Sequence, residues 1–418
     1  MAAMRSLHLA SVLFATACSS TPAEEPNLVK SELPRDTNPT VPAADLDTLV
    51  ADNTAFAVDL YHLVRGEPGN LFMSPHSIST ALAMTYAGAA NGTAGEIADT
   101  LRFTLPEDRL HAALNALDLE LASRADAADA DTIPFRLRTA NSIWGQEGAT
   151  FLTPFLDTLA VNYGAGLRVL DFTADPEAAR STINGWVEDQ TSNKIVDLLP
   201  EGSIKDDTRL VLTNAIYFSA AWAEPFEASG TRDATFQTAS GPIQTSTMHG
   251  SLEARYAAGS GWRAVELPYD GGQLAMTIIV PDDLAAYEAA LDPADLAAVT
   301  SALSHHQVTL SLPKFEFDAP VSLKTALQEL GMPSAFTEAA DFSRIDGTRG
   351  LAISDVLHKG FVSIDEQGTE AAAATGVVIG PTSVPPQAEL AVDRPFLFLI
   401  RDLPTGATLF VGRVVDPR

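Results

Sequence analysis

The residue types that usually perform catalysis form no recognisable pattern in this chain of 418 residues. There is no Gly-x-Ser-x-Gly for acyl transfer, no His-Glu-x-x-His for zinc-dependent hydrolysis and no Gly-x-x-x-x-Gly-Lys for phosphate binding. His305 and His306 are the only adjacent histidines, but neighbouring side chains of a strand point to opposite faces, so one metal ion could not easily bind both. The sequence therefore predicts no catalytic constellation, no metal site and no cofactor.

The stretch with the clearest chemical character runs from Glu366 to Pro386, and it has the composition of a peptide substrate. Small residues fill its first half, and two prolines close its far end, so that it is easily cut and hard to pack. In the two-residue period of a strand, the face without charge carries Thr369, Ala371, Ala373, Thr375, Val377 and Ile379. Such a segment could enter an existing sheet as an extra strand, with the charge of Glu370 left on the solvent side.

Composition limits the function classes. With 46% hydrophobic and 19% charged residues the chain is globular, and its length allows a sizeable core. Its net charge is -28, with 26 basic against 54 acidic residues. Because binding to phosphate groups needs a surplus of lysine and arginine, nucleic acid is not an expected partner.

The N-terminus has the pattern of a targeting segment, predicted over residues 1–18. An apolar run from Leu7 to Ala17 leads to Ala15-Thr16-Ala17-Cys18, which resembles a bacterial lipobox with Cys18 as the lipidated residue. Ordinary signal cleavage nearby is the alternative. Cys18 is the only cysteine, which excludes an intramolecular disulfide. We expect an exported protein, held at the bacterial cell envelope only through a lipid anchor, or secreted.

Two further segments follow this leader. Residues 19–45 are rich in proline and polar residues, and we expect a disordered tether there. The folded domain is predicted over residues 46–418, because apolar residues recur at helical spacing from Leu46 to Val64.

The first half of the domain is predicted to be mainly helical and the second half mainly sheet. Helices are expected at 75–88, 94–101, 110–124, 154–163 and 176–191, with Ser74 and Pro75 opening the first of them. Strands are expected at 210–218, 263–267, 274–280, 308–317, 361–364, 396–400 and 408–414. Helices followed by strands, without regular alternation, indicate an α+β domain with mixed or antiparallel sheets.

With these elements placed, the chain from about Leu46 to Arg418 resembles the serpin family. Several ordered motifs carry the resemblance: Asn70–Ser79, Asn214–Phe218 with Trp222, Leu312–Phe315, His358-Lys359, Asp365–Ala372 and Asp393–Phe398. The resemblance implies three β-sheets with about eight or nine helices and an exposed reactive-centre loop, in a monomer that is not an enzyme. It also implies suicide inhibition, in which a serine proteinase attacks the loop and the loop then inserts into the main sheet.

Matching motif to motif gives residues their implied roles. The polar shutter beneath the opening strands would be Ser74, Ser77, Asn214 and His358. The breach at the top of the sheet would be Trp222, Lys314 and Glu366, and the hinge of the loop would be Glu366, Gly368, Thr369, Ala371, Ala372, Ala373 and Ala374.

The hinge favours an inhibitor, since bulky or charged residues or proline there mark the non-inhibitory members of the family. Counting forward from Glu366 places the reactive bond at Thr382-Ser383, and counting back from Asp393 places it near Val384-Pro385. We prefer the forward count, because the first half of the loop must match the length of the sheet. Arginine and lysine are absent between Lys359 and Arg394, which favours elastase-like or subtilisin-like targets over trypsin-like ones.

Two rival hypotheses remain. The chain could be a non-inhibitory serpin that acts as a surface binding or chaperone-like protein, with a loop that is merely cleavable. A hydrolytic or surface-structural lipoprotein is the second rival, which the missing motifs disfavour.

Overall fold

The structure is a computed structural model that describes residues 27–126, 135–369 and 385–418. Ten α-helices lie within this part of the chain, six of them in its first half and close to their predicted bounds. They are α1 (Ala43–Val64), α2 (Pro75–Tyr86), α3 (Asn91–Thr100), α4 (Glu107–Ala122), α5 (Thr153–Tyr163), α6 (Pro176–Gln190), α7 (Leu284–Ala290), α8 (Pro293–Ala302), α9 (Lys324–Leu330) and α10 (Ser343–Asp346). None of the described helices is long and apolar enough to span a bilayer.

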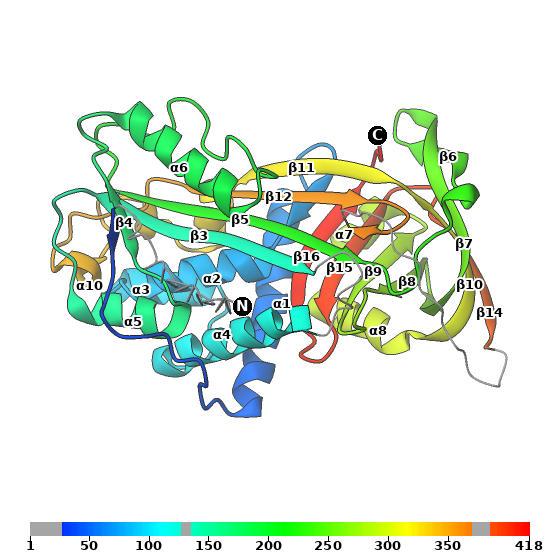
Figure 1. Cartoon of the computed structure of the whole chain (residues 1–418), viewed down its shortest axis with the longest axis horizontal. Helices are drawn as coiled ribbons and strands as arrows, with labels where there is room; N and C mark the ends of the chain where they lie inside the picture. The colour runs from blue at the N-terminus through cyan, green and yellow to red at the C-terminus, as the bar shows by residue number, and fades with distance from the viewer. Residues whose placement is uncertain (1–26, 127–134, 370–384) are drawn as a thin grey trace, which may run out of the picture.

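The first sheet has seven strands and a mixed direction. Its order is β1 (Leu28–Val29), β4 (Leu167–Leu170), β3 (Arg136–Gln146), β5 (Leu210–Ala221), β13 (Gly368–Thr369), β12 (Val356–Ile364) and β11 (Phe315–Ser322). In Figure 1, α6 lies above this sheet and α2, α4 and α5 lie below it, so both faces are covered. All twelve residues of β5 are buried as a consequence.

The second sheet contains the remaining nine strands of the described chain. Its path is β14 (Gln387–Ala391), β10 (Ser304–Pro313), β7 (Gly241–Gly259), β8 (Trp262–Pro268), β9 (Leu274–Pro281), β15 (Phe396–Asp402), β16 (Thr408–Val414) and β2 (Leu71–Met73), and β6 (Arg232–Thr238) pairs with β7. The described strands therefore form two sheets instead of the expected three. The long strand β7 pairs with β6, β8 and β10, so all these strands belong to one sheet.

The core lies between the two sheets and around α2. Phe72 stacks on Phe410 with ring centroids 4.9 Å apart, and it also stacks on Phe398 at 5.7 Å. Helix α2 is buried over most of its length. It begins where it does because Ser74 caps its N-terminus by accepting a hydrogen bond from the Ser77 amide and Pro75 occupies its first position. The core thus surrounds the helix whose first turn carries Ser74 and Ser77.

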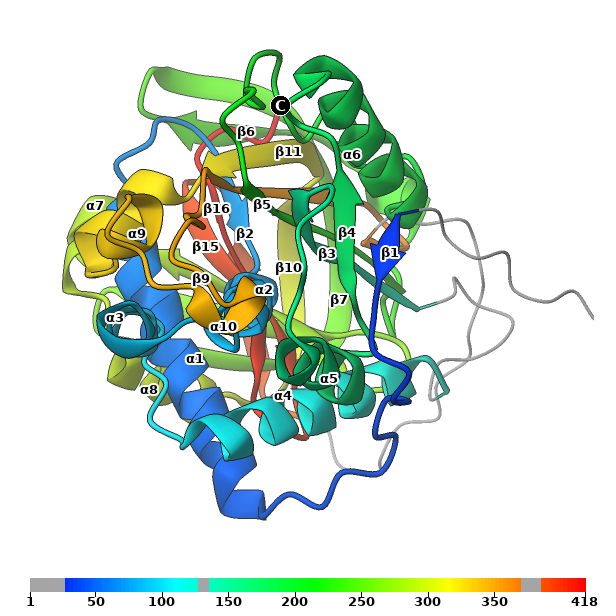
Figure 2. The same ribbon diagram turned by 90° about the vertical axis from the view of Figure 1, so that its left-hand side faces the viewer.

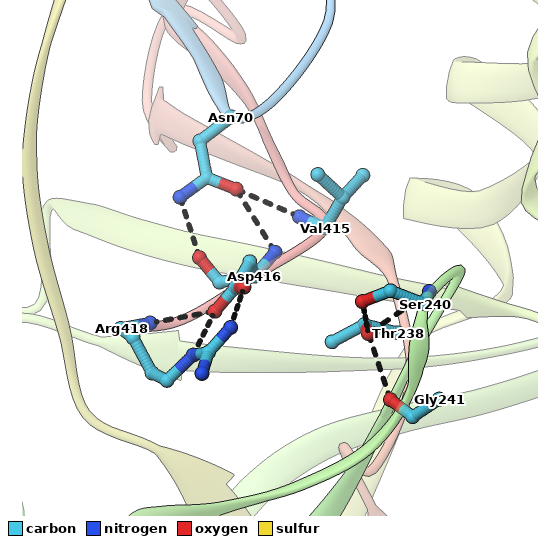
Figure 3. A network of polar contacts seen from close by, with 7 residues as sticks. All are labelled: Asn70, Thr238, Ser240, Gly241, Val415, Asp416 and Arg418. Atoms are coloured by element: carbon cyan, nitrogen blue, oxygen red, sulfur yellow. Dashed lines mark hydrogen bonds and ion pairs between the residues drawn. The ribbon is translucent and has the colours of Figure 1, made fainter.

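Asn70, just before β2, fixes the C-terminal residues to this core (Figure 3). Its amide donates to the Asp416 carbonyl at 2.7 Å and its oxygen accepts from the amides of Val415 and Asp416. Arg418 then pairs with the Asp416 carboxylate at 2.6 Å. One asparagine therefore holds three backbone groups of the tail.

The predicted tether is wrong for residues 27–45. Leu28 and Val29 form β1, which pairs antiparallel with β4, and α1 already begins at Ala43. Ser31 donates a hydrogen bond to Asp157 of α5 at 2.5 Å, and Arg35 reaches Asp118 of α4 at 2.6 Å. These contacts offset the entropy of ordering a segment whose composition alone suggests disorder. Figure 2 shows this segment running down the side of the molecule at β1.

Candidate functional site

The central strands β5 and β12 pair directly along their first part and are separated by β13 farther along. They pair in parallel from Leu212 with Val356 to Tyr217 with Phe361. Beyond this stretch β13 lies between them and is antiparallel to both, with Thr369 opposite Ala220 of β5 and Ile364 of β12. Gly368 and Thr369 of the predicted hinge thus already occupy a strand position in the sheet.

Gly368 enters the sheet at a point where no side chain fits. A Cβ atom on Gly368 would lie 2.2 Å from the Ala220 carbonyl oxygen, which is a backbone atom and cannot rotate away. The Gly368 carbonyl accepts a hydrogen bond from the Asp365 amide at 3.0 Å and closes the turn between β12 and β13. Glycine at this position therefore permits the close approach of β13 to β5.

Thr369 follows with its side chain fully inside the protein, at 1% exposure. Its Oγ1 lies 2.7 Å from the Tyr269 hydroxyl oxygen. The Tyr269 ring stacks on Trp222 with centroids 4.7 Å apart, and burial raises the pKa of Tyr269 well above its usual value. The face of the hinge that carries Thr369 is hence the buried face.

The breach residues meet around the turn that precedes β13. The Trp222 indole donates to the Asp365 carbonyl at 3.0 Å, and the Trp222 amide donates to the Gln367 carbonyl at 2.8 Å. Lys314 binds one oxygen of the Glu366 carboxylate at 2.7 Å, and Thr231 donates to the other at 2.6 Å. Burial opposes ionisation of Glu366, but these two hydrogen bonds outweigh burial and lower its pKa.

The four predicted shutter residues also come together, beneath the closed part of the β5–β12 pair. Asn214 and His358 are direct cross-strand partners, and the Asn214 oxygen binds His358 Nδ1. The Asn214 amide donates to Ser77 Oγ at 2.8 Å, and the Ser74 amide donates to His358 Nε2 at 3.1 Å. Two strands and the N-terminus of α2 are thereby linked in one buried polar cluster.

His358 is held as a neutral imidazole by its two partners. Its Nε2 accepts from a backbone amide, so this nitrogen carries no proton, and Nδ1 must be the donor to the Asn214 oxygen. His358 is 1% exposed, and burial lowers its pKa to about 3 from 6.5. Protonation would replace the acceptor at Nε2 with a donor that faces the Ser74 amide.

Asn141 of β3 is a member of this cluster that the sequence analysis missed. It lies opposite Asn214 in the sheet, its oxygen accepts from Ser77 Oγ at 3.1 Å, and its amide donates to the Ser77 carbonyl at 3.2 Å. The available signal was a polar residue among Ala140, Ile143 and Trp144, in a stretch for which no strand was predicted. The cluster therefore spans β3, β5 and β12.

Several predicted site residues lie outside the described part of the chain. These are Cys18, the hinge residues Ala371 to Ala374 and the reactive-bond residues Thr382 and Ser383. His305 and His306 are consecutive residues of β10, and the His306 ring contacts Tyr256 at 5.4 Å. Among the described residues, no three His, Cys, Asp or Glu side chains are grouped as metal ligands.

The fold and the ordered motifs match one family. A family model described as Serpin (serine protease inhibitor) matches residues 51–417. The chain belongs to the serpin family, and membership of this family supports protease inhibition as its general activity.

Relatives and solved structures agree with this assignment. The chain is 36% identical over 398 residues to an uncharacterized serpin-like protein of Thermococcus kodakarensis, covering 92% of this chain and 91% of that protein. It is 36% identical over 386 residues to the leukocyte elastase inhibitor of Bos taurus, covering 89% of this chain and all of that one. The native thermophilic serpin tengpin superposes with a TM-score of 0.80 at 27% identity, covering 93% and 97% of the two chains. The predicted serpin fold is confirmed.

Proposed function

We propose that this protein inhibits serine proteinases as a suicide substrate whose loop inserts between β5 and β12. The proteinase serine oxygen attacks the carbonyl carbon of Thr382, the Thr382–Ser383 bond breaks, and the Ser383 amine leaves with the serine proton. The proteinase is then esterified to Thr382, and insertion of the loop traps the ester before water can hydrolyse it. The observation that carries the proposal is β13, because it already starts the inserted strand between β5 and β12.

The register of β13 explains why the rest of the hinge needs small residues. Continued from Thr369, it would place Ala371 between Phe218 and Val362 on the buried face of the sheet. It would place Ala373 between Ile216 and Gly360, and a Cβ atom on Gly360 would lie 2.7 Å from the Phe72 ring. Methyl-sized side chains suit a layer this closely packed.

The target class follows from the loop sequence. The residues near Thr382 are small or medium and mostly apolar, which suits the pockets of elastase-like and subtilisin-like proteinases. A relative of 36% identity is named a leukocyte elastase inhibitor, which agrees in kind with this class.

The test is a denaturing gel after mixing the protein with elastase or subtilisin. Trapping gives a band at the summed mass that survives SDS, and mass spectrometry of the released fragment should place the cut between Gly380 and Pro385. In the variant Thr369→Arg a charge would enter the site beside Tyr269, and we expect cleavage without complex. Complete cleavage of the wild type without complex would instead support the non-inhibitory binding or chaperone-like serpin.

We also propose that the protein is a monomer, exported and attached to the cell envelope through a lipid on Cys18. The support is the apolar run and the small residues before the only cysteine. Labelling of cells with a radioactive fatty acid should mark the wild type, whereas Cys18→Ser should be unlabelled. Label retained by Cys18→Ser would refute the anchor.

A further inference from the structure

Tyr269 makes a contact between the two sheets at the hinge. It follows β8 in the second sheet, forms an isolated β-bridge with Trp222, and its amide donates to the Leu274 carbonyl at 2.9 Å. Its hydroxyl reaches across to Thr369 of β13 in the first sheet. A residue that follows a strand of the second sheet thereby binds the buried Thr369 side chain of the hinge.

We propose that Tyr269 is a positioning residue that latches Thr369 in the sheet and sets the register of the hinge before a proteinase arrives. This inference deepens the proposed function, since it assigns the residue that starts insertion at the correct place. Its role in trapping rests on the proposed function, and its geometry rests on the described contacts of β13.

The burial of the two hydroxyls gives the latch its strength. Tyr269 is 0% exposed and Thr369 is 1% exposed, so neither hydroxyl can exchange its partner for bulk water while β13 stays in place. Losing the contact in the buried state leaves an unpaired polar group, which is costlier than losing a hydrogen bond at the surface.

The geometry of the ring gives the latch its direction. Trp222 stacks on one face of Tyr269 with an interplanar angle of 11°, and Phe218 meets the ring edge to face at 5.1 Å. The hydroxyl is therefore fixed in space, and Thr369 satisfies it only when it lies opposite Ala220. A slip of the hinge by one residue would turn Thr369 to the other face of the sheet.

Hydrogen exchange of the fragment Glu366–Thr369 tests the latch without any proteinase. We expect exchange about 5- to 10-fold faster in Tyr269→Phe and in Thr369→Val, because each variant removes one hydroxyl and favours local opening of β13. Thr369→Ser keeps a hydroxyl and should exchange at the wild-type rate. The double variant should exchange no faster than either single one, since both remove the same bond. Exchange in β16 is the control and should stay unchanged.

A second measurement follows the trap itself. With elastase, the ratio of cleaved to complexed inhibitor should rise about 5-fold in Tyr269→Phe, because the hinge must find its register before it inserts. Gly368→Ala, which forces β13 away from Ala220, should raise exchange by itself and make Tyr269→Phe without further effect.

The outcomes separate the latch from the proposed function. If wild-type protein forms no complex but the exchange results hold, the inhibition proposal fails and the latch stands. Unchanged exchange in Tyr269→Phe, additive effects in the double variant, or equal acceleration in β16 would each overturn the latch.

Discussion

The neutral state of His358 predicts a specific dependence of stability on pH. Burial places its folded pKa at about 3, against 6.5 for the ordinary side chain. The unfolded chain therefore binds more protons than the folded one at any pH between these values. The free energy of unfolding should be unaffected by His358 above pH 6.5 and should fall steadily as the pH is lowered from 6.5 toward 3.

The size of this effect follows from the shift. Each pH unit below 6.5 removes about 1.4 kcal/mol until the folded pKa is approached, so His358 alone costs about 2 kcal/mol at pH 5 and about 4 kcal/mol at pH 3. For a domain of this size about 2 kcal/mol corresponds to about 2–3 °C in Tm. Protonation would also place a donor at Nε2 against the Ser74 amide and break the contact that joins β12 to the start of α2, so sheet opening should be easier in acid.

The assay compares Tm at pH 7 and pH 5 at one scan rate for wild type, His358→Gln and His305→Gln. The glutamine at position 358 can still accept from the Ser74 amide but takes up no proton. Between pH 7 and pH 5 the Tm of His358→Gln should therefore fall about 2–3 °C less than the Tm of the wild type. His305 is exposed on β10, and its substitution should leave the pH dependence of the wild type intact. Buried His76 is present in all three proteins, so its contribution to the pH dependence of Tm cancels in the comparison. Equal losses in wild type and His358→Gln would refute the neutral, buried histidine.

Two further changes test the sheet edge and the breach. Gly166→Ala would bring a Cβ atom to 2.6 Å from the Val29 carbonyl oxygen of β1 and should lower the unfolding free energy by about 1–3 kcal/mol. Gly185→Ala, in α6 with nothing within 4 Å, should instead be neutral or stabilising in the same melting experiment, and equal effects would argue against docked β1. Lys314→Met removes the ion pair to Glu366 and should cost about 1 kcal/mol at low salt. That difference should shrink in about 1 M NaCl, and a loss independent of salt would contradict an electrostatic role.

The first six helices could be predicted because local signals marked them. Apolar residues at helical spacing and caps such as Ser74 with Pro75 act within one turn of the chain, and the structure keeps those bounds within a few residues. The predicted strand 308–317 is broken at Lys314, between β10 and β11, which belong to different sheets. Nothing in the apolar pattern distinguishes one long strand from two short ones that part at a proline and a lysine.

Long-range contacts explain the elements that the sequence analysis missed. Strand β1 has only two residues, and its partner β4 lies more than a hundred positions away. Strand β3 begins with the exposed Arg136 and Arg138, so its apolar alternation is weak where it starts. Helix α8 carried a usable local signal, because Asp292 and Asp295 form a capping box around Pro293.

The residues of the candidate site also fall into those that the sequence predicted and those that it missed. Asn214, His358, Ser74 and Ser77 were predicted to form one cluster because the family resemblance implied that they are neighbours. Their spacing in the sequence does not show this. Asn141 belongs to β3, for which no motif was noted, and Tyr269 follows β8 outside any of the quoted motifs. Both residues act through partners that become neighbours only when the sheets are formed.

The polar cluster and the loop sequence together bear on whether insertion is favourable. To admit a full strand, β5 and β12 must separate between Asn214 and His358, and the two atoms of their mutual contact, the Asn214 oxygen and His358 Nδ1, would cost about 1–3 kcal/mol each if left unpaired. The register of β13, continued downward, would bring Thr375 level with both of them. Between Ala371 and Ile379, Thr375 is the one polar residue on that face of the loop, and its hydroxyl can donate and accept. In the proposed inserted state the Thr375 hydroxyl could thus replace the contact that Asn214 and His358 lose when the strands separate. The added strand would also gain backbone hydrogen bonds on both sides.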